Sequence, residues 1–151
     1  AAALRRLVVE SMRGAATPVV VAGDFNDTLG SVTTQIVADT SWRRGDRPQR
    51  DRMLYDARAV ERRPPGAAAD RGRHTILHGG EPETIDHVLV SEEFVPESRR
   101  ALGRVRAVEV FNDHLDERAR AERLGDPSFA ALARVASDHA PVCVTLEFGK
   151  D

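Results

Sequence analysis

A continuous apolar run over residues 18–22 leads directly into the polar sequence Gly23-Asp24-Phe25-Asn26. A short run of this kind, bounded by turn residues, is typical of a strand buried on both faces at the centre of a sheet. Because side chains alternate along an extended chain, Asp24 and Asn26 should project to one side and Phe25 to the other. The glycine would let a ligand approach the backbone. A plain exit into a turn is the alternative, since Asp and Asn both favour turns.

A second apolar segment, residues 84–90, carries a carboxylate at Asp86. An ionised carboxylate in such a strand is costly unless another group neutralises it. The alternative is an edge strand with one face in solvent. His87 should lie on the face opposite Asp86, so we interpret it as a packing or surface residue.

A third polar group, Ser137-Asp138-His139, opens the last predicted strand, residues 141–148. Adjacent side chains diverge, so these three residues cannot form a hydrolytic triad among themselves. A carboxylate next to an imidazole suits a site in which Asp138 faces a cation while a distant carboxylate, such as Asp86, orients His139.

Composition limits the classes of function. The chain has 151 residues, enough for one domain, and its formal net charge is −2, so no overall field attracts a polyanion such as nucleic acid. Cys143 is the single cysteine, which excludes an intrachain disulfide, and its apolar neighbours predict a buried side chain. No apolar run approaches the roughly 20 residues that span a bilayer, and the first residues have no signal-peptide layout. The sequence leaves a cytoplasmic and a secreted location open.

The remaining elements are predicted from periodicity and turn residues. We expect helices at the start of the chain, after Ser31, and after Asp126-Pro127, and a strand over residues 105–111. Residues 42–73 are polar and broken by prolines, which predicts long surface loops except over residues 53–60, whose sequence is typical of a packed segment. We interpret the arginines of this stretch mainly as solvated: Arg43, Arg44, Arg47, Arg50 and Arg52.

Together, the three polar segments resemble the endonuclease/exonuclease/phosphatase superfamily of metal-dependent phosphoesterases. The matching motifs are Gly23-Asp24-Phe25-Asn26, Ile85-Asp86-His87 and Ser137-Asp138-His139-Ala140-Pro141. The resemblance covers essentially the whole chain. It implies an α/β fold, the C-terminal half of a four-layer α/β/β/α sandwich with mostly antiparallel or mixed sheets and flanking helices. Residues 1–151 would then form a single partial domain whose N-terminal half is absent.

The resemblance also implies roles for individual residues. Phosphoester bonds would be hydrolysed by in-line attack of water with the help of Mg²⁺ or Mn²⁺. Asp24 would orient or deprotonate the water, and Asn26 would hold Asp24 and a phosphoryl oxygen. Asp86 would pair with His139 and keep its ring protonated toward the phosphate, and Asp138 would bind the metal together with Asp24.

The resemblance implies that the substrate is a phosphate-containing molecule, either nucleic acid or a small phosphoester, and the sequence leaves DNA, RNA, lipid headgroups and small phosphates open. Its specificity is expected to come from the loops of residues 42–78, in which Arg73 could contact a phosphate. In the family, the N-terminal half normally supplies a metal-binding glutamate. We therefore expect the isolated chain to bind magnesium weakly and to have little activity. The alternative is a non-catalytic binding or scaffold module that retains the fold.

Overall fold

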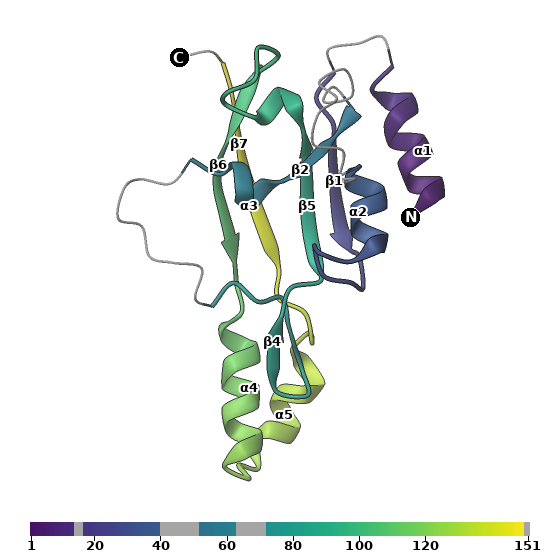
Figure 1. Ribbon diagram of the computed structural model, residues 1–151. Helices are drawn as coiled ribbons and strands as arrows, with labels where there is room; N and C mark the ends of the chain where they lie inside the picture. Colours follow the sequence, from purple (N-terminus) through teal and green to yellow (C-terminus); the bar gives the residue numbers. More distant parts are fainter. Residues whose placement is uncertain (14–16, 40–51, 63–71, 150–151) are drawn as a thin grey trace.

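The computed structural model describes residues 1–13, 17–39, 52–62 and 72–149 (Figure 1). Residues 43–50, whose arginines we interpreted as solvated, lie outside these ranges. The elements in chain order are α1 (Ala2–Ser11), β1 (Val20–Asp24), α2 (Val32–Ala38), β2 (Leu54–Asp56), α3 (Ala57–Val60), β3 (Ile76–His78), β4 (Glu81–Glu83), β5 (Asp86–Ser91), the 3₁₀ helix η2 (Glu92–Phe94), β6 (Gly103–Val110), α4 (Asp113–Arg123), α5 (Ser128–Val135) and β7 (Val142–Phe148).

All strand pairs of the described ranges are antiparallel. β1, β5 and β2 form one sheet in that order, β6 pairs with β7, and β3 with β4 forms a hairpin. The expectation that residues 18–22 form a central strand is wrong for the part of the chain described. β1 lies at the edge of its sheet with Val20 44% exposed, whereas β5 is central and buries Leu89 and Val90 completely.

Two apolar clusters hold the layers together. Leu89 contributes to one cluster with α1 and α2, and the next residue, Val90, contributes to the other with β6. This step of one residue places the two side chains on opposite faces of β5. One face of the three-stranded sheet is therefore covered by helices and the other by the β6–β7 sheet (Figure 1). The predicted mixed α/β architecture, with antiparallel sheets and flanking helices, is confirmed.

The helix starts follow the predicted capping chemistry. The Ser31 hydroxyl accepts a hydrogen bond from the Thr34 N–H at 3.2 Å, and the Asp126 carboxylate accepts one from the Ser128 N–H at 2.8 Å. No helix in the described ranges is long and apolar enough to cross a bilayer. The expectation of a buried Cys143 is wrong, because alternation along β7 places it on the exposed outer face.

One end of the sheets gathers the polar segments. β1 runs toward this end, whereas β5 and β7 begin there, beside the β3–β4 hairpin, α4 and α5 (Figure 1). Antiparallel pairing thus brings the C-terminal end of one strand to the N-terminal end of the next.

Candidate active site

Asp24 and Asp86 are direct partners across β1 and β5. The adjoining backbone is fixed by a hydrogen bond of 2.9 Å from the Phe25 N–H to the Ile85 carbonyl. Opposed residues of an antiparallel pair share a face, so the two carboxylates lie side by side. Like charges in this arrangement are destabilising, and the strand ends are therefore suited to binding positive charge.

His139 supplies part of that positive charge. Its Nδ1 atom lies 2.9 Å from the Asp86 carboxylate, and the two side chains are 27% and 19% exposed. This is the contact that the sequence predicted. The turn that carries the ring is closed by the His139 N–H, which donates to the Ser137 hydroxyl at 3.0 Å. Ligand atoms of Asp24, Asp86 and His139 all lie within 4.8 Å of one another. We call these three residues the carboxylate–imidazole cluster.

The electrostatics of the cluster favour the imidazolium. The hydrogen bond to Asp86 raises the pKa of His139 above the ordinary value of 6.5, partial burial opposes this, and the charges of Asp86, Asp24 and Asp138 add to the rise. A larger share of the His139 rings is therefore protonated at neutral pH than for a free histidine.

Replacing Asp86 by Asn should lower the pKa of His139 toward that ordinary value, because the largest cause of the rise is removed. A folded-state pKa that is raised stabilises the fold fully below the unfolded value and progressively less as the pH rises through the folded value. The variant should therefore lose more unfolding free energy, relative to wild type, at about pH 6 than at about pH 9. Proton NMR titration of the His139 ring in metal-free buffer measures the shift, with Asp113→Asn, an exposed carboxylate of α4, as control. An unchanged pKa would contradict the assigned pairing.

Asn26 holds Asp24 in place. Its N–H donates to one carboxylate oxygen of Asp24 at 2.7 Å, and its side-chain amide donates to the other at 3.1 Å. The chain turns at Asn26 with a φ of 51°, a left-handed conformation that Asn tolerates better than most residues. Next to them, Gly23 has a φ of +155°, and within the described ranges no atom beyond Gly23 and its two chain neighbours lies within 4 Å of the position that a Cβ would occupy. The described residues therefore leave the position of a Cβ at Gly23, beside Asp24, unobstructed.

Asp138 does not join the cluster. Its side chain is exposed and lines a cavity of about 160 Å³ with residues of the β3–β4 hairpin and α4. The group of close ligand atoms found in the described ranges contains Asp86 where the sequence analysis had placed Asp138. Adjacent side chains diverge, so the turn that presents His139 to Asp86 directs its neighbour elsewhere. The geometry thus favours a role in which the charge of Asp138 helps to raise the pKa of His139.

Arg73 is engaged in the fold. Its guanidinium pairs with both oxygens of Glu61 at 3.0 and 3.3 Å and donates to the Val108 carbonyl at 2.6 Å. The Val108 N–H in turn donates to Glu61 at 2.9 Å, so the ion pair occupies the open edge of β6 as a neighbouring strand would. The side chains are only 21% and 7% exposed. The geometry does not support the expected phosphate contact, because the planar donors of Arg73 are used internally.

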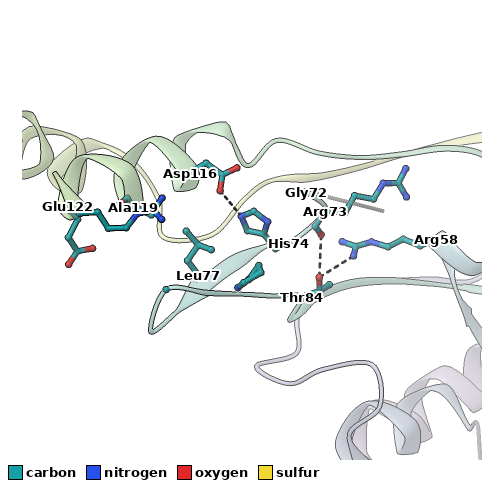
Figure 2. A pocket seen from close by; sticks show the side chains of 12 residues that line it. Arg58, Gly72, Arg73, His74, Leu77, Thr84, Asp116, Ala119 and Glu122 are labelled. Carbon is teal, nitrogen blue, oxygen red and sulfur yellow. Dashed lines mark hydrogen bonds and ion pairs between the residues drawn. The ribbon is translucent and has the colours of Figure 1, made fainter. Parts of the chain in front are cut away.

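A cavity of about 740 Å³ lies between the β3–β4 hairpin, α3 and α4 (Figure 2). On one side, the Thr84 hydroxyl contacts Arg58 and the Arg73 carbonyl, each at 3.3 Å. On the other, His74 lies 3.4 Å from the Asp116 carboxylate (Figure 2). The carboxylate–imidazole cluster contributes Asp86 and His139 to a separate cavity of about 320 Å³.

Sequence reasoning missed one contributor to the site. The Thr75 hydroxyl accepts a hydrogen bond of 3.2 Å from the Asp86 N–H. Nothing in the periodicity marks this position. The weak signal available was a polar residue directly before the apolar pair Ile76-Leu77, at the start of a strand.

Comparison with known proteins adds one match. A family model described as "Endonuclease/Exonuclease/phosphatase family" matches residues 1–139, a range that includes every polar strand-end residue named above. Neither the curated proteins nor the solved structures contain a significant match.

Proposed function

The chain belongs to the endonuclease/exonuclease/phosphatase family, and we propose that its carboxylate–imidazole cluster is the catalytic part of a magnesium-dependent hydrolase of phosphoester bonds. Family members generally hydrolyse such bonds in phosphate-containing substrates and depend on a divalent metal. The observation that carries the proposal is the register of β1 and β5, which sets Asp24 against Asp86 while His139 pairs with the latter.

The donor set fits a hard divalent cation. Asp24 and Asp86 offer carboxylate oxygens, which Mg²⁺ and Mn²⁺ prefer, and these oxygens lie within 4.8 Å of each other. Positive charge there would also offset the repulsion between the two carboxylates. We propose that Asp24, with Asp86 in place of the expected Asp138, holds this cation. When bound, it would polarise a phosphoryl oxygen and offset the charge that develops on the leaving oxygen.

The residues of the chain supply the remaining chemistry. Asp24, fixed by two hydrogen bonds from Asn26, orients a water molecule and accepts its proton as the water oxygen attacks phosphorus. The bond from phosphorus to the leaving oxygen breaks in line with the attack. His139, kept protonated by Asp86, donates a charged hydrogen bond to a phosphoryl oxygen and stabilises the transition state. Asn26 contributes a second contact to the phosphoryl group.

We further propose that residues 1–151 are part of one domain, completed by an N-terminal half of the same protein; we call this longer protein the parent. In the described ranges, β1 and β7 each lie at a sheet edge, and Val20 of β1 is 44% exposed. An exposed apolar edge strand is a site where further strands pair. Because the N-terminal half normally supplies a metal-binding glutamate in the family, the isolated chain would bind magnesium weakly and turn over little substrate.

Paramagnetic Mn²⁺ tests the location of the cation in the chain as it stands. Added to ¹⁵N-labelled chain, it should broaden the amide signals around Asp24, Asp86 and His139 first, and excess Mg²⁺ should restore them. Asp24→Asn should abolish the effect, whereas Asp113→Asn on α4 should leave it intact. Broadening that begins at the acidic start of α4, or none at millimolar Mn²⁺, would refute the proposed site.

A further inference from the structure

Thr75 lies at the junction of the segments that form the site. It is completely buried, with 0% of its surface exposed. Its hydroxyl accepts hydrogen bonds from the Ile85 N–H at 3.1 Å and the Asp86 N–H at 3.2 Å. Its carbonyl accepts one from the Ala140 N–H at 2.8 Å, next to His139. One residue therefore joins the backbones that carry both partners of the Asp86–His139 pair.

The hydroxyl fills a gap in the sheet. β2 pairs only with Leu89–Ser91, so it ends before Asp86, the first residue of β5. On that side of β5, no residue of β2 lies opposite Asp86 to accept a hydrogen bond from its N–H. A buried N–H needs an acceptor, and the Thr75 side chain supplies it where a strand carbonyl would otherwise lie.

The same network reaches the third segment. The Phe25 N–H donates to the Ile85 carbonyl at 2.9 Å, while the Ile85 N–H donates to Thr75. The backbone beside Asp24 is thus tied, through one residue, to the threonine that also holds the other two members of the cluster. Displacements of about 1 Å in such a constellation lower rates by about 100-fold.

We propose that Thr75 is a positioning residue of the phosphoester site, which holds the Asp86 backbone in register with the turn of His139. This inference rests on the proposed function for its effect on catalysis, although the geometric part is independent of it. The hydroxyl touches neither substrate nor cation in this role and acts through Asp86.

Two substitutions separate positioning from simple packing. Thr75→Val keeps the shape but removes the acceptor, whereas Thr75→Ser keeps the hydroxyl and removes a methyl group. Thr34→Val is the matched control, because Thr34 of α2 is also 0% exposed and its hydroxyl contacts that of Ser31, the N-cap of the helix. In the parent, Thr75→Val should lower kcat for bis(p-nitrophenyl) phosphate by about 100-fold with little change in KM. Thr75→Ser and Thr34→Val should each stay within a few-fold of wild type.

A second readout needs no activity. The His139 Nδ1–H bonded to Asp86 should give a downfield proton NMR signal in the 151-residue chain, present in the wild type and Thr75→Ser and lost in Thr75→Val. Wild-type kcat together with an unchanged signal in Thr75→Val would overturn the proposal while the proposed function stands. An inactive wild-type parent would overturn the proposed function, and the NMR signal would still decide the role of Thr75. If Thr75→Val does not fold by circular dichroism, Thr75→Ala is measured with the same two outcomes.

Discussion

Replacing His139 by Gln in the parent should lower kcat for phosphodiester cleavage by about 100- to 1,000-fold. Glutamine retains a polar side chain but loses the positive charge that Asp86 maintains on the imidazole. Asp24→Asn should lower kcat by about 100- to 10,000-fold, because an amide cannot accept the proton of the attacking water. Initial rates with bis(p-nitrophenyl) phosphate at saturating Mg²⁺ measure both effects.

His78→Gln is the matched control, since His78 is an exposed histidine of the β3–β4 hairpin. Its kcat should equal that of the wild type. The alternative, a scaffold module without catalysis, predicts a different result. It expects phosphate ligands to bind wild type, His139→Gln and Asp24→Asn alike, with no cleavage by any of them, and that result would replace the hydrolase by a binding module.

The second large effect concerns stability. Replacing Arg73 by Ala should reduce the free energy of unfolding by about 3–5 kcal/mol, because Glu61, whose side chain is 7% exposed, loses its two-point ion pair with the guanidinium. The Val108 carbonyl also loses a donor, at the edge of β6. Urea denaturation followed by circular dichroism measures the loss. The double variant Arg73→Met with Glu61→Met should recover much of it, since neither charge then remains buried.

A more exposed ion pair between β6 and β7 provides the control. Arg104 of β6 pairs with Glu147 at 3.0 Å, and the Glu147 side chain is 48% exposed. Arg104→Ala should cost only about 0–1 kcal/mol. If Arg73→Ala were equally mild, and if it instead raised KM for the phosphodiester, the earlier interpretation of Arg73 as a substrate contact would be restored.

The part of the site that sequence could predict is the part governed by alternation. Asp86 in an apolar strand needed a neutralising partner, and the family resemblance implied that this partner is His139. His87 was expected to be a packing or surface residue, and the structure shows packing: it is 4% exposed and edge-to-face with Phe25 at 5.4 Å between ring centroids. Period-two alternation indicates the face of a sheet on which a side chain lies. It therefore indicated the faces on which these side chains lie, whereas the pairing of Asp86 with His139 was implied by the family resemblance.

Alternation does not indicate which strand lies alongside. Residues 18–22 have the composition of a central strand, yet in the described ranges β5 alone pairs with β1. The pairing of Arg73 with Glu61 joins two polar segments without periodicity, and no local pattern distinguishes it from a solvated arginine. The separation of Asp138 from His139 depends on a tight turn whose geometry the sequence only outlines. These features are tertiary, and each required the assembled sheets.

The most direct test of the central claim is the metal dependence of phosphodiester hydrolysis by the parent. Turnover of bis(p-nitrophenyl) phosphate should occur with Mg²⁺ or Mn²⁺, disappear with EDTA and return when the cation is restored. The double variant Asp24→Asn with Asp86→Asn should show none of this turnover at any Mg²⁺ concentration. Hydrolysis that continues in EDTA, or that survives in the double variant, would contradict the account.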